Sequence, residues 1–192
     1  MSIRLGDIAP DFTADTTQGV LSFHDWKEGA WAVLFSHPAD FTPVCTTELG
    51  RTAALSGEFA ARNAKAIAVS VDSVEDHLRW VPDIAEVAGV DVDFPIIADE
   101  DRSVSQAYDM IHPGEGDTST VRSVFLIDPS NTVRLTITYP KSVGRNFTEI
   151  LRALDALQAT DRSPVSTPPE WVPGARVLAA AALAPHEARE RS

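Results

Sequence analysis

Short apolar runs alternate with longer amphipathic segments along most of this chain, and that alternation restricts the folds open to it. Runs at 32–36, 66–71 and 94–98 predict buried strands, and the apolar spacing at 46–63 and 74–88 predicts helices. A helix between two strands carries the chain back across the sheet, so such strands pair in parallel. The middle of the chain is therefore predicted to be a parallel sheet.

The flanking segments add antiparallel strands and a last helix. A hairpin is predicted at 11–21, and the strands predicted at 121–128 and 133–139 are joined by the turn residues Pro129-Ser130-Asn131. A strongly amphipathic stretch predicts a helix at 146–159. This order predicts an α/β thioredoxin-like fold, in which helices cover both faces of a mixed central sheet.

A proline-rich stretch at 163–173 marks the expected end of that domain. We expect residues 1–162 to form the thioredoxin-like domain and residues 163–192 to form a short C-terminal extension. The extension carries apolar side chains that favour burial, namely Trp171, Val177, Leu178 and Leu183.

Composition and charge exclude several classes of partner. The formal net charge of −12 disfavours binding to nucleic acid or to anionic membranes. We find neither an N-terminal signal stretch nor a run of 18 apolar residues, and we expect a cytoplasmic protein. A single thiol that other thiols must restore also suits a reducing compartment.

Cys45 is the only cysteine in the 192 residues, so it can neither close an internal disulfide nor build a thiolate metal cage. It follows the strand predicted at 32–36 and lies in the first turn of the next predicted helix. Unpaired backbone N–H groups and the positive end of the helix dipole favour a thiolate there. Thr42, one turn earlier, can offer its hydroxyl to the sulfur or to a substrate oxygen, while Pro38 and Pro43 restrict the loop.

The segment FSHPADFTPVCTTELGR at 35–51 closely resembles the peroxidatic loop of the peroxiredoxins, in particular their one-cysteine, peroxiredoxin-6-like subfamily. The match is long and contiguous, and it extends to other parts of the chain. Residues 5–12 resemble the N-terminal segment of the family, 121–128 its arginine-bearing strand, and 139–147 a later signature of the subfamily. The resemblance covers roughly residues 3 to 175.

The resemblance implies a thiol-dependent peroxidase that reduces hydrogen peroxide and alkyl hydroperoxides. The Cys45 thiolate would attack one peroxide oxygen and become a sulfenic acid, which an external thiol then reduces. Arg122, the Thr42 hydroxyl and the Cys45 backbone N–H would stabilise the developing charge, and Pro38 would shield the site from water. The family also implies a homodimer in which the extension packs on the partner subunit. We expect no cofactor and no metal.

Three further residues are expected to support this site. Glu48 lies one turn after Cys45, where its charge would oppose a thiolate, so we expect Arg145 or Arg122 to neutralise it. His37 either contacts the peroxide or the oxidised sulfur, as in the subfamily, or only fixes the loop. The remaining histidines, His77 among them, have no spacing typical of a metal site.

Two other functions compete with this interpretation. A thiol-disulfide oxidoreductase is disfavoured because residue 42 is threonine, so the Cys-x-x-Cys motif is absent. A chaperone or redox sensor that uses Cys45 without turnover remains open. Some relatives also have phospholipase activity, but Ala30 stands at the position of their serine, and we expect none by that mechanism.

Overall fold

The structure of the protein is a computed structural model, which describes residues 3–179. The chain divides into two compact units, residues 1–147 and 148–192. The boundary that the sequence favours, after residue 162, stays a prediction. Each unit is described by itself.

The first unit is built on a seven-stranded mixed sheet with the strand order β2-β1-β5-β4-β3-β6-β7. The strands β3, β4 and β5 pair in parallel and the remaining pairs are antiparallel, which confirms both the parallel centre and the final hairpin. Strand β3 lies inside the sheet, between β4 and β6, and all six of its residues are buried. The strands are β1 (Thr13–Thr16), β2 (Gly19–Ser22), β3 (Trp31–Ser36), β4 (Ala64–Ser70), β5 (Ile96–Ala98), β6 (Arg122–Ile127) and β7 (Val133–Tyr139).

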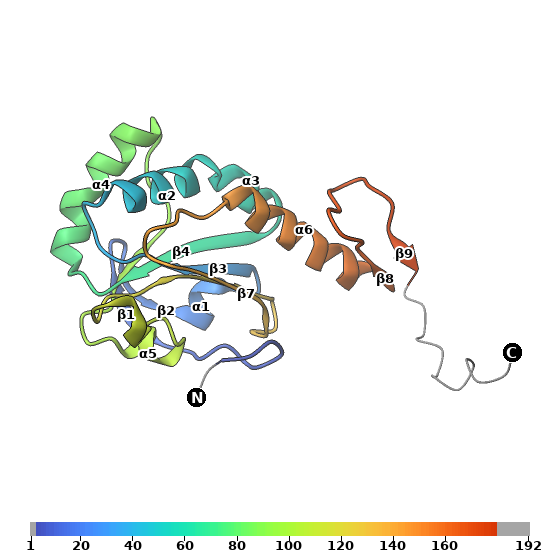
Figure 1. The fold of residues 1–192 in the computed structure, drawn as a ribbon, viewed down its shortest axis with the longest axis horizontal. Coiled ribbons are helices and arrows are strands. Elements are labelled where there is room, and N and C mark those ends of the chain that lie inside the picture. Colours follow the sequence, from blue (N-terminus) through green and yellow to red (C-terminus); the bar gives the residue numbers. More distant parts are fainter. Residues whose placement is uncertain (1–2, 180–192) are drawn as a thin grey trace, which may run out of the picture. The chain divides into compact units, whose positions relative to one another are not determined.

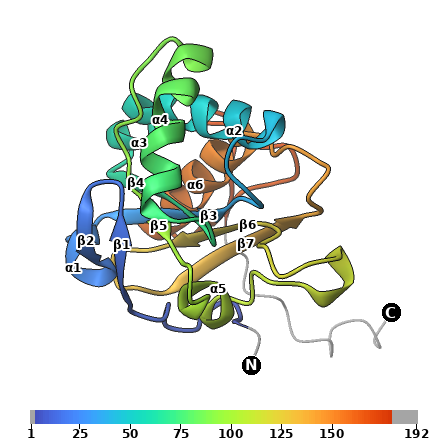
Figure 2. The same cartoon turned by 90° about the vertical axis from the view of Figure 1, so that its left-hand side faces the viewer.

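Helices cover both faces of this sheet, as the sequence predicts. Figure 1 shows α2, α3 and α4 on one face and α1 and α5 on the other, and Figure 2 shows the same layers from the side. The helices are α1 (Phe23–Lys27), α2 (Pro43–Ala54), α3 (Ser56–Ala61), α4 (Val74–Ala88) and α5 (Ser103–Ala107), with a short 3-10 turn at Pro113–Glu115.

The predicted helix at 46–63 is wrong in two respects. It begins earlier, because Thr42 has extended backbone angles at the N-cap and Pro43 takes the first helical position, where its missing N–H costs nothing. It is also broken at Leu55, which has φ −101° and ψ 7°. The spacing could not reveal this break, since Leu55 at the break and Phe59 one turn beyond it are both buried. Helices α1 and α5 were missed because five residues are too short to show a helical period.

The core on the α1 and α5 side is rich in aromatic side chains. Phe12 stacks on Phe23 with ring centroids 4.8 Å apart, and Tyr108 meets Phe125 edge-on at 5.2 Å. Residues of every strand from β2 to β7 contribute to this cluster. The packed sheet holds β3 rigidly, so the loop that leaves its carboxyl end starts from a fixed point.

The second unit contains α6 (Phe147–Arg162) and a small antiparallel pair, β8 (Val165–Ser166) and β9 (Leu178–Ala179). Trp171 is buried here, its backbone oxygen accepts from Arg152 Nη1 at 3.0 Å, and its Nε1 donates to the Ala175 oxygen at 3.1 Å. Leu178 is half exposed, and Leu183 lies outside the described residues. Among residues 3–179, no helix has the length and apolar character needed to cross a bilayer.

Candidate active site around Cys45

Cys45 lies in the first turn of α2, as the sequence predicts, and its side chain is fully buried. The short loop 37–42 leads from the carboxyl end of β3 to this turn. The carboxyl ends of parallel strands are the usual place for a ligand in an open α/β sheet. The fold therefore places a buried sulfur at a helix N-terminus and at the ligand-binding edge of the sheet.

Arg122 reaches the sulfur from the neighbouring strand β6. Its Nη1 donates to Cys45 Sγ at 3.4 Å and to Glu48 Oε2 at 2.7 Å, and its Nε donates to the Lys141 oxygen at 2.9 Å. Because β6 pairs with β3 in the sheet, the guanidinium is held on a rigid element. A cation fixed beside the sulfur can stabilise negative charge that spreads from sulfur to oxygen.

Glu48 and Arg145 form the other half of this cluster. Arg145 donates to Glu48 from its backbone N at 2.7 Å, from Nε at 2.9 Å and from Nη2 at 2.7 Å. Burial would raise the pKa of the Glu48 carboxyl, but the hydrogen bonds and charge of Arg145, with the charge of Arg122, hold that pKa below its ordinary value. Sequence analysis left open which arginine pairs with Glu48, and both do.

The charges of this buried cluster balance only when the sulfur is ionised. Arg122 and Arg145 contribute two positive charges, while Glu48 contributes one negative charge. All three side chains are buried, where an uncompensated charge is costly. A thiolate at Cys45 supplies the second negative charge and makes the cluster neutral.

Thr42 and Pro38 occupy the loop as expected, but neither bonds the sulfur. The Thr42 hydroxyl donates to the Ala39 oxygen at 3.0 Å, so its one hydrogen is already used. Its backbone oxygen accepts from Thr46 N at 3.0 Å and from Thr46 Oγ1 at 2.9 Å, which fixes the start of α2. Pro38 is half buried between His37 and Ala39. The described contacts thus give both residues a place in the loop, and their catalytic roles stay predictions.

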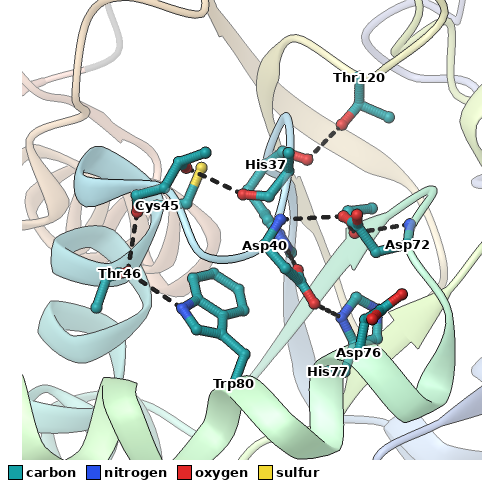
Figure 3. Close-up of polar contacts among 12 residues, drawn as sticks. His37, Asp40, Cys45, Thr46, Asp72, Asp76, His77, Trp80 and Thr120 are labelled. Atoms are coloured by element: carbon teal, nitrogen blue, oxygen red, sulfur yellow. Dashed lines mark hydrogen bonds and ion pairs between the residues drawn. The ribbon is translucent and has the colours of Figure 1, made fainter.

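His37 belongs to a second buried cluster that sequence analysis missed. Its Nε2 lies 2.9 Å from Asp40 Oδ1, and Asp40 Oδ2 lies 2.6 Å from His77 Nδ1 (Figure 3). Nitrogen and oxygen atoms of the three residues lie within 4.8 Å of one another, an arrangement that could hold a metal ion. Sequence analysis assigned His77 no part in any site, because 37 residues separate it from Asp40 and only the packing of α4 beside the loop brings them together.

Comparisons with known proteins agree with this geometry. Residues 5–136 match the model of the AhpC/TSA family. The chain is 52% identical over 172 residues to the 1-Cys peroxiredoxin of Dictyostelium discoideum, which covers 90% of this chain and 71% of that protein. It is also 48% identical to peroxiredoxin-6 of Rattus norvegicus, with 98% of this chain and 88% of that protein covered.

Two solved structures are similar over nearly the same length. A cysteine-to-serine mutant of the peroxiredoxin 6 of Arenicola marina superimposes with a TM-score of 0.91 at 47% identity, covering 97% of this chain and 88% of that one. A yeast mitochondrial 1-Cys peroxiredoxin, studied for thiol resolving through the glutathione and thioredoxin systems, gives a TM-score of 0.87 at 50% identity. Here 91% of this chain and 85% of that one are covered.

Proposed function

The chain belongs to the AhpC/TSA family as a one-cysteine peroxiredoxin, and from this premise we propose how its site reduces hydroperoxides. The protein is a thiol-dependent peroxidase whose single cysteine forms a sulfenic acid that an external thiol reduces. The observation that carries the proposed roles is the Arg122 guanidinium shared between Cys45 Sγ and the Glu48 carboxylate.

In the first half of the cycle, the Cys45 thiolate attacks one oxygen of the hydroperoxide in line with the O–O bond. The S–O bond forms and the O–O bond breaks. The leaving oxygen takes a proton and departs as water or alcohol, while the sulfur is oxidised by two electrons to sulfenic acid. Negative charge spreads over sulfur and both oxygens in the transition state, where Arg122 and the backbone N–H groups of the first turn can stabilise it.

Arg145 acts on this step through Glu48. Its three bonds hold the carboxylate, and the carboxylate in turn orients Arg122 through the bond from Nη1. Without this neutralised carboxylate, two buried guanidinium groups would face one thiolate. Glu48 and Arg145 are therefore assigned supporting roles, Arg122 the direct one, and Thr42 and Pro38 the shaping of the loop.

In the second half of the cycle, an external thiol attacks the sulfenic sulfur, water leaves, and a second thiol releases Cys45 from the mixed disulfide. In the yeast relative, the thiol is resolved through the glutathione and thioredoxin systems. For this chain we propose glutathione as the reducing thiol. Cys45 is fully buried, and a small thiol enters a narrow site more readily than a folded protein does.

Catalytic turnover separates this function from a sensor that uses Cys45 without turnover. We expect micromolar enzyme to consume many equivalents of hydrogen peroxide when a thiol is supplied, and none with Cys45→Ser. Glutathione with its reductase, and thioredoxin with its reductase, would be compared at equal electron supply. Consumption that stops after one equivalent with both reductants would identify a sensor.

We also propose a homodimer, supported by the free edge of β7. This seven-residue strand ends the sheet, so one side of its backbone has no partner strand among the described residues. Val172 and Leu178 of the extension are also about half exposed, which supports its packing on a partner subunit. Light scattering should give the mass of a dimer. Thr136→Lys, an exposed change on β7, should shift that mass toward the monomer, and a monomeric wild type would contradict the proposal.

We place the protein in the cytoplasm, since its single thiol depends on a reducing compartment. Fractionation of the source cells with an antibody to the protein would check this.

A further inference from the structure

A buried cluster of His37, Asp40 and His77 lies beside the peroxidase site and has no part in the mechanism above. Both histidines are fully buried and the Asp40 carboxylate is nearly so. Figure 3 shows Asp40 reaching from the loop toward His77 on α4, with Trp80 of the same helix close to Thr46. The Trp80 ring lies 5.3 Å from the His37 ring, and Trp80 Nε1 donates to Thr46 Oγ1 at 3.1 Å. The cluster is thus packed against the residue that follows Cys45.

The proton positions on His77 follow from its two partners. Its Nε2 lies 3.1 Å from the Ile97 carbonyl oxygen, which can only accept, so Nε2 carries a hydrogen. Its Nδ1 lies 2.6 Å from Asp40 Oδ2, and that short bond contains one proton. Whichever atom carries it, the pair of His77 and Asp40 is neutral.

This arrangement determines the tautomer of His37. The shared proton occupies the side of the carboxylate that faces His77, so the other oxygen, Oδ1, is an acceptor for His37 Nε2 at 2.9 Å. His37 therefore carries its hydrogen on Nε2. Burial lowers the pKa of His37 more than Asp40 raises it, so the ring is neutral and Nδ1 is bare.

The bare Nδ1 is a buried acceptor without a partner among residues 3–179. A buried acceptor left unpaired is costly, and a ligand that brings a hydrogen-bond donor to Nδ1 would remove that cost. His37 is the first residue of the loop 37–42 that leads to the helix of Cys45, and Thr120 Oγ1 donates to its backbone oxygen at 2.7 Å. Every hydroperoxide carries an O–H donor on the oxygen that the sulfur attacks; in hydrogen peroxide the leaving oxygen carries a second one.

We propose that His77 is a positioning residue of the peroxidase: through Asp40 it keeps the proton of His37 on Nε2, so that Nδ1 accepts the O–H of the bound hydroperoxide and turns that oxygen toward Cys45. The inference rests on the proposed function, since it assigns a task within the same site. It also explains why a carboxylate and two histidines are buried together at a cost that packing alone does not require.

The same donor set fits a divalent cation, which would replace the protons of the two bonds to Asp40. The nitrogen–oxygen distances of 2.6 and 2.9 Å are those of charge-assisted hydrogen bonds, so protons satisfy these atoms without a metal. The two occupants respond differently to one substitution. In Asp40→Asn the amide oxygen accepts from His37 Nε2 and the amide N–H donates to a neutral His77, which preserves the tautomer of His37 but removes a metal ligand.

The experiment reads the tautomer and the rate on the reduced full-length protein. Long-range proton–nitrogen NMR of histidine-labelled protein should show His37 protonated at Nε2 and bare at Nδ1. The rate of Cys45 oxidation by hydrogen peroxide is then measured for His77→Phe, for Asp40→Asn and for Trp80→Phe. The last variant removes a hydrogen bond of the same helix without changing the proton count of the cluster, so it controls for disturbance of α4.

In His77→Phe, the buried Asp40 carboxylate loses the group that neutralises it, and His37 is the remaining base bonded to it. We expect His37 to take up a proton from solvent at Nδ1 as the counter-charge, so that Nδ1 turns into a donor. We expect the oxidation rate to fall about tenfold, the factor for one lost hydrogen bond in the transition state. Asp40→Asn and Trp80→Phe should stay within about threefold of wild type and keep the His37 tautomer. If His77→Phe does not fold, the wild-type spectrum and the oxidation rate of Asp40→Asn still test the inference. The spectrum shows which nitrogen of His37 carries the proton, and the rate shows whether the reaction depends on that tautomer.

Four results would overturn the inference: a His37 proton on Nδ1 in the wild type, equal rates for His77→Phe and Trp80→Phe, an Asp40→Asn variant as slow as His77→Phe, or activity lost to a chelator and restored by Zn²⁺. None of these touches the proposed function, because the wild type would still consume peroxide. A wild type without turnover would instead refute the proposed function, whatever the histidine spectra show.

Discussion

Replacing Arg122 by leucine should slow the attack of Cys45 on hydrogen peroxide by about 10²–10³ while the protein stays folded. The guanidinium donates to Sγ at 3.4 Å and lies where charge develops on the peroxide oxygens. Loss of one preorganised donor of this kind costs about 2.7–4 kcal/mol in the transition state, which gives the expected factor.

The effect on stability should be smaller than the effect on rate. Without Arg122, Glu48 still accepts three hydrogen bonds from Arg145, so its buried charge remains paired. We expect a loss of about 1.5–3 kcal/mol in the free energy of unfolding, the usual worth of a hydrogen bond to a charged group. Arg145→Leu is the matched contrast. It removes the two side-chain bonds and the charge of Arg145, and leaves Glu48 with the bond from Arg122 and the one from the backbone N of residue 145. The loss should reach about 3–5 kcal/mol, as for other broken buried ion pairs.

Stopped-flow oxidation from pH 6 to pH 10 and urea unfolding would be measured for both variants. Arg122→Leu within threefold of wild type at all pH values would refute the transition-state role. If the rate of Arg122→Leu equalled that of wild type near pH 10, where an ordinary cysteine is ionised without help, Arg122 would act only by favouring the thiolate. If Arg122→Leu were as unstable as Arg145→Leu, the division of roles within the cluster would be wrong.

Three further outcomes follow from the site. Cys45→Ser should abolish turnover and keep the thermal unfolding temperature within a few degrees, since a buried sulfur is replaced by a smaller atom and no disulfide is lost; appreciable residual turnover would contradict the assignment. With no second cysteine in the chain, the sulfenic acid of Cys45 waits for an external thiol. High peroxide with little reductant should therefore oxidise it further, and mass spectra should show two added oxygens on the Cys45 peptide. A predominantly disulfide-linked dimer on non-reducing gels after one equivalent of peroxide would contradict the one-cysteine mechanism. Stability should also fall as the pH drops, because the folded-state pKa values of His37, Asp40 and Glu48 lie below their ordinary values of 6.5, 3.8 and 4.5. The unfolded chain therefore binds more protons than the folded chain as these groups titrate. The free energy of unfolding should begin to decrease below about pH 6.5, through His37, and decrease further below about pH 4.5, through the two carboxyl groups. Urea unfolding between pH 8 and pH 3 checks this, and a free energy of unfolding that rises toward pH 5 would contradict it.

The sheet and the position of Cys45 were predictable because they depend on local patterns. An apolar run followed by Pro43 and helical spacing is enough to place the cysteine in a first turn after β3. The break at Leu55 was not predictable, because buried residues continue on the same face beyond it. Helical spacing reports which face is buried and does not report a change in the direction of the axis.

The cluster around Glu48 and the cluster around His77 also differed in how far the sequence could predict them. A carboxylate one turn after a thiolate must be neutralised, so a partner for Glu48 could be expected from the chain itself, and the family resemblance suggested Arg122 and Arg145. No comparable demand pointed to His77, since a lone histidine on an amphipathic helix is most often an ordinary packing residue. Its significance depends on which atom of each ring meets which oxygen, and only coordinates supply that.

Both clusters nevertheless follow from one physical requirement. The loop 37–42 and the first two turns of α2 bury Asp40 and Glu48, one on each side of Cys45 in the sequence. Each buried charge must be compensated within hydrogen-bonding distance. The segment is too short to supply both partners, so they come from β6, from the stretch around Arg145 and from α4. Charge compensation therefore also fixes the conformation of the loop. The residues that neutralise Asp40 and Glu48 bind the two ends of the segment to separate elements of the first unit. A change on α4, at His77, should for this reason alter the reaction at Cys45 although no described bond joins the two residues.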